Sequence, residues 1–217
     1  MEASVAQIVV CTEAEGPGKR FALWFQGCPL RCPGCCNPEF LPFKGGTIRS
    51  VDSLIEQIVG AKAERGIEGI TLLGGEPFAH AEPAAALARA SQDIGLSVMV
   101  FTGYLLEDLA KPQAVRGPLA VSRETRDILE HTDILVDGPY VREQPDTTRR
   151  WIGSANQRIH FLTDRYRFDD QWRTRNTLEI RVVGSEITVN GFPAKNAVGL
   201  WKGWTRRPAP RPEPETR

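Results

Sequence analysis

Three cysteines near the start of the chain are the residues best suited to metal chemistry. Cys28, Cys32 and Cys35 have a C-x3-C-x2-C spacing within the loop 27–37. Three thiolates on one short loop can converge on a single point, and a sulfur-rich pocket of this kind selects zinc or an iron–sulfur cluster. We therefore expect a metal site in this cysteine loop.

The sequence offers no obvious fourth ligand for this site. Cys36 is adjacent to Cys35, and neighbouring residues cannot easily both turn towards one metal. The three histidines lie far downstream without ligand spacing; they are His80, His131 and His160. A structural zinc site needs four protein ligands, whereas a four-iron cluster held by three thiolates keeps one iron free for an exogenous ligand. The spacing favours a catalytic cluster, with a zinc ribbon or knuckle as the alternative.

The segments around the cysteine loop must form the elements that position it. Residues 21–25 are a nearly continuous apolar run, typical of a strand buried on both faces of a parallel sheet, and they lead into the loop. Apolar spacing after Ser50 and a stop at Gly66 predict a helix. Residues 139–156 carry few apolar side chains and are expected to form a loop. Further strands are expected at 7–11, 67–73, 96–101, 134–136 and 158–162, and further helices at 83–94, 105–110 and 123–131.

This alternation of strands and helices predicts an α/β fold with a parallel sheet and helices outside it. In such folds ligands bind at the carboxyl ends of the strands, because the loops converge there while the strands themselves form packed core. Four motifs follow predicted strands: the cysteine loop, 74–77, 102–104 and 137–138. We expect them to meet in one active site.

These motifs resemble those of the radical S-adenosylmethionine (SAM) enzymes. In both, a C-x3-C-x2-C loop follows an apolar strand, and a later strand ends in Gly-Gly-Glu-Pro, here residues 74–77. Within that superfamily the sequence is most similar to the activases of glycyl-radical enzymes, above all that of anaerobic ribonucleotide reductase. The further matching segments are 16–20, 102–104, 133–138 and 153–158. The likeness runs in family order from residue 8 to residue 163.

The resemblance implies a fold, two cofactors and a reaction. The fold is a partial, open (β/α) barrel. Cys28, Cys32 and Cys35 hold a [4Fe–4S] cluster, and SAM binds the free iron through its amino and carboxylate groups. One electron from the reduced cluster splits SAM into methionine and a 5′-deoxyadenosyl radical, while the protein positions the cofactor and excludes water.

The resemblance also implies which residues bind SAM. It assigns Gly74 and Gly75 to backbone contacts with the methionyl part, and the Glu76 carboxylate to the ligated amino group. Three more residues are assigned to SAM or to the mouth of the site: Thr102, Asp137 and Asn156. Without the resemblance, each of these residues could equally form a strand-ending turn, a turn cap or a loop hydrogen bond.

Two positions depart from the pattern of the activases. Many of them have Asp-x-Lys where this sequence has Asp137-Gly138-Pro139, so the role of the lysine is not assigned. Cys36 follows the last cluster ligand, where relatives often place an aromatic or histidine residue beside the adenine. We expect this small cysteine to pack near the cluster.

Composition limits the classes of partner. The 217 residues include 27 basic and 27 acidic side chains, so the net charge of zero does not indicate nucleic acid or an acidic membrane as a partner. No apolar run reaches the roughly 18 residues of a membrane span, and residues 1–4 lack the pattern of a secretion signal. Five clustered cysteines fit a reducing compartment. We therefore expect a cytoplasmic protein without a nucleic-acid or membrane partner.

The chain is expected to have three parts. Residues 1–164 would be the radical SAM core, and residues 165–205 a C-terminal β extension, because 178–189 alternate apolar and polar side chains like a hairpin. Trp201 and Trp204 in this extension fit a core or a hydrophobic patch. The tail 206–217 is rich in proline and arginine and is expected to be disordered.

Three functions fit these observations. The leading hypothesis is an activase that takes hydrogen from a glycine of a large partner enzyme and receives electrons from a donor such as flavodoxin or ferredoxin. The first alternative is a radical SAM enzyme that acts on a small molecule or peptide. The second is a non-catalytic metal-binding or electron-transfer module, which would not turn over SAM.

Overall fold

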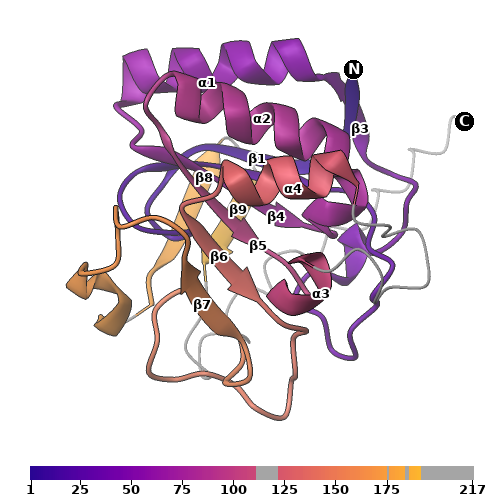
Figure 1. Ribbon diagram of the computed structural model, residues 1–217, viewed down its shortest axis with the longest axis vertical. Coiled ribbons are helices and arrows are strands. Elements are labelled where there is room, and N and C mark those ends of the chain that lie inside the picture. Colours follow the sequence, from indigo (N-terminus) through magenta and orange to yellow (C-terminus); the bar gives the residue numbers. More distant parts are fainter. Residues whose placement is uncertain (111–121, 175, 184–185, 192–217) are drawn as a thin grey trace, which may run out of the picture.

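The computed structural model describes residues 1–110, 122–174, 176–183 and 186–191. The centre of the molecule is a seven-stranded sheet in the order β3-β1-β2-β4-β5-β6-β7, with helices along one face (Figure 1). Its strands are β1 (Glu2–Thr12), β2 (Arg20–Phe25), β3 (Thr47–Ser50), β4 (Gly69–Gly74), β5 (Ser97–Phe101), β6 (Ile134–Asp137) and β7 (Arg158–Phe161).

The four central strands run parallel, but the outer strands do not. Pairing is parallel through β2, β4, β5 and β6, while β1, β3 and β7 are antiparallel to their neighbours. The prediction of a parallel sheet is therefore wrong for the outer strands. The connection from β1 to β2 spans only residues 13–19, and a parallel pair would need a longer crossover.

The helices have the expected order. They are α1 (Val51–Arg65), α2 (Ala81–Asp93), α3 (Leu106–Ala110) and α4 (Arg123–Glu130), with 3₁₀ turns η1 (Pro38–Phe40), η2 (Pro77–His80) and η3 (Asp170–Arg173). The Ser50 hydroxyl caps α1 by accepting from Ser53 N at 3.1 Å, and Gly66 ends it with a φ of 64°. Both ends of α1 are therefore as predicted.

Most of the core lies between the sheet and α1, α2 and α4, which cover the same face (Figure 1). Outward-facing strand residues meet helix residues there and are almost fully removed from water, which is the main favourable term in folding. They include Phe21, Leu23, Phe25, Ile70, Leu72, Val98, Val100 and Leu135 from the strands, and Leu54, Ile58, Leu87 and Ile128 from the helices.

The opposite face of the sheet is covered by the segment that follows β6 and by η3. Met99 and Val136 pack there against Trp151 and Trp172, whose rings meet edge to face at 4.9 Å. Trp151 is only 1% exposed and has a φ of 65°, a conformation that is rare for a bulky residue. The sequence predicts only a loop here, because isolated aromatic residues have no periodicity.

Two elements lie at the borders of this architecture. The strand β3 was not predicted, because all four of its residues are exposed and no alternation of apolar and polar side chains marks it. The strands β8 (Leu178–Val183) and β9 (Glu186–Gly191) pair antiparallel as a separate two-stranded sheet. The expectations for Trp201, Trp204 and the tail 206–217 fall outside the described residues.

Within the described ranges, no helix combines the length and the apolar character needed to cross a bilayer.

Candidate functional site

The cysteine loop leaves the sheet at the carboxyl end of β2. Its entrance is fixed by two backbone hydrogen bonds to the segment that follows it. Gly27 N donates to Phe40 O at 2.8 Å, and Cys28 N donates to Leu41 O at 3.0 Å. The loop therefore begins and ends beside the same strand.

The three predicted cluster ligands differ in exposure. Cys28 is buried, whereas Cys32 and Cys35 are partly exposed. A backbone hydrogen bond links the last two, because Cys35 N donates to Cys32 O at 3.1 Å. Burial raises the pKa of the Cys28 and Cys35 thiols, and the nearby cysteines raise it further. A bound metal would offset this effect by stabilising the thiolates.

The thiols do not form a site for a single ion. In the part of the chain that the structure describes, no three His, Cys, Asp or Glu side chains are grouped so that they could hold one. The assignment of Cys28, Cys32 and Cys35 as ligands of one metal group therefore stays a prediction. A four-iron cluster is larger than one ion, and each of its thiolate ligands binds a different iron. Three cysteines on one loop fit that donor set.

Gly74 and Gly75 bring β4 into backbone contact with the cysteine loop. Gly75 N donates to Phe25 O at 2.7 Å, and Glu76 N donates to Gly27 O at 3.0 Å. A Cβ atom on Gly75 would lie 2.1 Å from Gly27 O, so no larger residue fits there without a shift of backbone. Two motifs that the sequence predicted to share one edge therefore touch.

Glu76 links β4 to the end of β5. Its carboxylate is 1% exposed and accepts from Thr102 Oγ1 at 2.9 Å, Gly103 N at 2.9 Å and Phe78 N at 3.0 Å. Burial raises the pKa of Glu76 to about 7, although these donors act in the opposite direction. Glu76 thus holds the ends of β4 and β5 together, a role that the sequence did not reveal. The Thr102 hydroxyl donates its hydrogen bond to Glu76.

Asp137, at the end of β6, is fully buried and paired. It accepts from Arg158 Nε at 3.0 Å and from Leu106 N at 2.8 Å, and Arg158 also donates to both oxygens of Glu107 at 2.8 and 2.7 Å. Burial opposes ionisation of Asp137, but the Arg158 and Leu106 donors lower its pKa overall. Arg158 supplies the cation beside Asp137, in a segment that lacks the lysine.

Asn156 lies at the same edge and bonds to the segment after β6. Its Nδ2 donates to Pro139 O at 2.7 Å. Gln157 Nε2 donates to Gly138 O at 3.2 Å, and its Oε1 accepts from the backbone of Gly153 and Ser154 at 3.1 Å each. The loop 153–157 is therefore internally closed and tied to residues 138–139.

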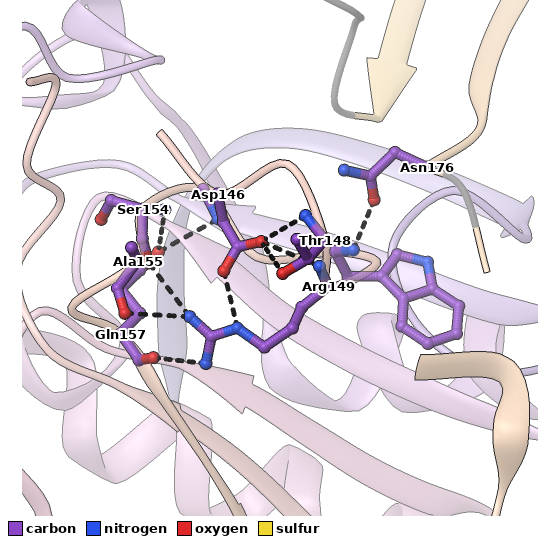
Figure 2. Close-up of polar contacts among 9 residues, drawn as sticks. Asp146, Thr148, Arg149, Ser154, Ala155, Gln157 and Asn176 are labelled. Atoms are coloured by element: carbon purple, nitrogen blue, oxygen red, sulfur yellow. Dashed lines mark hydrogen bonds and ion pairs between the residues drawn. The ribbon is translucent and has the colours of Figure 1, made fainter. Parts of the chain in front are cut away.

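Arg149 ties this loop to Asp146 through its guanidinium (Figure 2). Its guanidinium donates to Asp146 Oδ2 at 2.6 Å, Gln157 O at 2.7 Å and Ala155 O at 3.1 Å. Asp146 in turn accepts from the backbone of Thr148 and of Arg149 itself at 2.8 Å. Neither Asp146 nor Arg149 was predicted from the sequence. A signal exists for Asp146, because aspartate often accepts from the backbone two or three residues on.

One segment of the family pattern lies away from this edge. Arg20 is the first residue of β2, at the amino end of the parallel strands, and is fully buried. Its guanidinium donates to Ser97 Oγ at 2.6 Å, to Thr71 Oγ1 at 3.0 Å and to backbone carbonyls. Residues 16–20 thus close the opposite end of the sheet.

The fold and the cysteine loop define a class that comparison with known proteins supports. The chain matches the family model described as a 4Fe-4S single cluster domain over residues 14–160. It belongs to this family. The matched range contains all the predicted cluster and cofactor residues and ends within β7, before η3 and the β8–β9 pair.

Several relatives carry the same, more particular name: anaerobic ribonucleoside-triphosphate reductase-activating protein. The one from Haemophilus influenzae is 33% identical over 152 residues, which are 67% of this chain and 89% of the relative. Those from Vibrio cholerae and Escherichia coli K12 are 31% and 30% identical, each over 68% of this chain and 91% of the relative. These matches confirm the resemblance drawn from the sequence.

Among solved structures, QueE from Escherichia coli is 18% identical to this chain, with 61% of this chain and 68% of that chain covered and a TM-score of 0.36. This likeness is too low to support a conclusion about the site.

Proposed function

We propose that this protein is a radical SAM activase. It cleaves SAM reductively at a [4Fe–4S] cluster and installs a glycyl radical on a partner enzyme such as anaerobic ribonucleotide reductase. The observation that carries the proposal is the backbone contact between the cysteine loop and Gly74–Glu76, in a chain whose relatives are named as activating proteins. This contact brings a cluster loop and a candidate SAM-binding turn together.

Cys28, Cys32 and Cys35 are the proposed cluster ligands. When bound, the reduced cluster supplies the electron that splits SAM into methionine and a 5′-deoxyadenosyl radical. Three parts of the chain would hold the cluster. The buried Cys28 would bind it on the side facing the protein, and Cys32 and Cys35 would bind it on the side nearer to solvent. The strand β4 holds the start of the cysteine loop in place through backbone hydrogen bonds.

Gly74, Gly75 and Glu76 are the proposed contacts for the methionyl part of SAM. The glycines leave main chain uncovered beside the cysteine loop. Glu76 already accepts three hydrogen bonds, so its remaining acceptor capacity is what a ligated amino group would use. Thr102 contributes by fixing the orientation of that carboxylate.

Asp137 and Asn156 are the proposed residues at the mouth of the site. The Asp137 carboxylate is held by Arg158, so its part is to keep the end of β6 and the start of α3 in place for SAM. Asn156 is exposed and bonded to Pro139 O, which leaves its carbonyl oxygen for the cofactor. Both roles depend on where the nucleoside lies.

We infer that the sheet is the wall of an open barrel, because four parallel strands deliver all the motifs to one edge. Residues 1–164 would form the catalytic core, and residues 165–205 an extension that includes the β8–β9 hairpin. The partner would be a glycyl-radical protein that closes the barrel mouth, and a flavodoxin or ferredoxin would supply electrons. The clustered free cysteines support a cytoplasmic, reducing environment.

The test uses the full chain, reconstituted with iron and sulfide under anaerobic conditions. We expect a four-iron cluster whose EPR spectrum changes when SAM is added, and formation of 5′-deoxyadenosine. With the large subunit of an anaerobic ribonucleotide reductase added, a glycyl-radical EPR signal should follow. Stoichiometric zinc without iron, or a cluster whose spectrum ignores SAM, would contradict the proposal.

Two cysteine variants distinguish loss of the cluster from loss of the fold. Cys32→Ala should lose iron and all nucleoside product while keeping the fold. Cys11→Ala is the control, because Cys11 packs against the helix-side core rather than in the cysteine loop. It should keep cluster and product at the wild-type level.

A further inference from the structure

The segment directly after β6, residues 138–142, lies between two loops of the site; we call it the bridging segment. On one side it contacts the cysteine loop. A Cβ atom on Gly34 would lie 2.6 Å from Arg142 Cδ, and the Tyr140 hydroxyl lies beside the Cys36 thiol. The bridging segment therefore packs against the end of the cysteine loop that contains the third cluster ligand.

On its other side, the bridging segment is bonded to the loop 153–157 at three successive points. Gln157 Nε2 donates to Gly138 O at 3.2 Å, and Asn156 Nδ2 donates to Pro139 O at 2.7 Å. Val141 N donates to Ser154 Oγ at 3.1 Å. Its position therefore depends on the position of that loop.

The loop 153–157 depends in turn on Arg149. One guanidinium draws together two of its carbonyl oxygens and the Asp146 carboxylate, which is 4% exposed (Figure 2). A planar group with five donors in fixed directions can do this, whereas a lysine ammonium acts as a single point charge. Arg149 lies three contacts away from the cysteine loop along one continuous path.

We propose that Arg149 is a positioning residue for the cysteine loop, acting through the loop 153–157 and the bridging segment. The inference rests on the proposed function for the identity of the group that the cysteine loop binds. Loss of the arginine geometry lets the bridging segment shift and loosens the Cys35 end of the loop. The cluster is then held less firmly and SAM binds less well, although no residue that touches either one has changed.

The neighbouring Arg150 provides a matched control. It has the same charge and lies one residue on, but its guanidinium points to another region. It stacks on the Trp151 ring at 4.4 Å and donates to Thr177 Oγ1 at 3.2 Å and to Glu13 O at 3.4 Å. The structure shows no contact from Arg150 to the loop 153–157 among the described hydrogen bonds.

The experiment compares Arg149→Lys with Arg150→Lys in the full chain. The first measurement is the rate of iron loss to an excess of chelator from anaerobically reconstituted protein. Changes to groups that orient metal ligands commonly cost one order of magnitude or more, so we expect Arg149→Lys to lose iron about tenfold faster. We expect Arg150→Lys to match the wild type. The KM for SAM should rise in Arg149→Lys more than kcat falls.

A second measurement does not need the cluster. Hydrogen exchange in the iron-free protein should be faster at Cys35 N, which donates to Cys32 O, in Arg149→Lys alone. Wild-type exchange and wild-type iron loss in Arg149→Lys would overturn the inference, as would equal acceleration in both arginine variants. If the wild type cleaves no SAM, the proposed function fails, yet iron loss and exchange still decide the positioning role.

A variant that does not fold would show itself in its melting temperature. In that case Arg142→Ala takes its place, because Arg142 contacts Gly34 without taking part in the Arg149 hydrogen bonds. It should also accelerate iron loss. A wild-type rate in folded Arg142→Ala would overturn the inference.

Discussion

The two ends of the parallel strands each bury a charged side chain, and they treat it differently. At the amino end, Arg20 is surrounded by hydroxyl and carbonyl acceptors. At the carboxyl end, Glu76 accepts from Thr102 Oγ1 and Gly103 N after β5 and from Phe78 N in η2. Burial lowers the pKa of Arg20 to about 10 and raises that of Glu76 to about 7. Arg20 keeps its charge at neutral pH, while Glu76 is poised between two charge states.

The difference suggests that one end of the sheet serves the stability of the fold and the other end serves the site. At the amino end, the donors of the Arg20 guanidinium are used by hydroxyl and carbonyl acceptors of the protein itself. The carboxyl end carries bare glycine backbone, thiols and a carboxylate with spare acceptor capacity. Substitutions at the amino end should therefore lower stability, whereas substitutions at the carboxyl end should lower SAM cleavage.

The largest effect is expected for Gly75→Ala. The new Cβ would lie 2.1 Å from Gly27 O, so β4 and the cysteine loop must separate. We expect SAM cleavage to be lost. Gly60→Ala is the control, because nothing lies within 4 Å of its Cβ position in α1, and alanine there should stabilise the helix by about 0.8 kcal/mol. If Gly75→Ala cleaved SAM at the wild-type rate, the contact between β4 and the cysteine loop would not be needed for the proposed function.

Arg20→Met should destabilise the protein without changing SAM binding. It removes the donors from several buried acceptors, and such losses typically cost about 4 kcal/mol in total. Chemical denaturation would measure the loss, and Arg126→Met, on the exposed face of α4, is the control. A raised KM for SAM in folded Arg20→Met would show that the amino end does take part in the site.

Glu15→Gln should change how stability depends on pH. Glu15 is buried, its main donor is Gly191 N at 2.8 Å, and burial raises its pKa to about 8. Its contribution to stability is fully present below about pH 4.5 and is lost as pH rises through 8. The glutamine variant should therefore gain in melting temperature relative to the wild type over that range. A constant difference from pH 4.5 to 8 would contradict a buried acid at this position.

The smallest effect is expected for Thr102→Val. The variant loses one donor to Glu76, which should cost about 1 kcal/mol. Because that donor favours the ionised carboxylate, the pKa of Glu76 should rise further and the loss should be larger at pH 8 than at pH 6. Melting temperatures at the two pH values would show this. An equal loss at both would mean that Thr102 acts through packing or through the bond that it accepts from Tyr104 N, and not through Glu76.

The sequence predicted the features that depend on local pattern. Apolar runs and capping residues located the central strands and α1, and the carboxyl-end rule brought the cysteine loop to Gly74–Glu76. Features that depend on distant partners were missed: the exposed β3, the antiparallel β7 and the hydrogen bonds of Arg149. No spacing in the sequence tells which of two adjacent arginines will reach two carbonyl oxygens of the loop 153–157 and which will stack on Trp151.

The packing of Trp151 against Trp172 bears on where this chain can be cut. The family match ends at residue 160, but the ring that covers Trp151 belongs to η3, beyond that point. A shortened protein that stopped at residue 160 would lose Trp172 and expose the Trp151 ring that it covers, and exposed apolar surface promotes aggregation. For expression and crystallisation, the useful unit should therefore extend past Trp172.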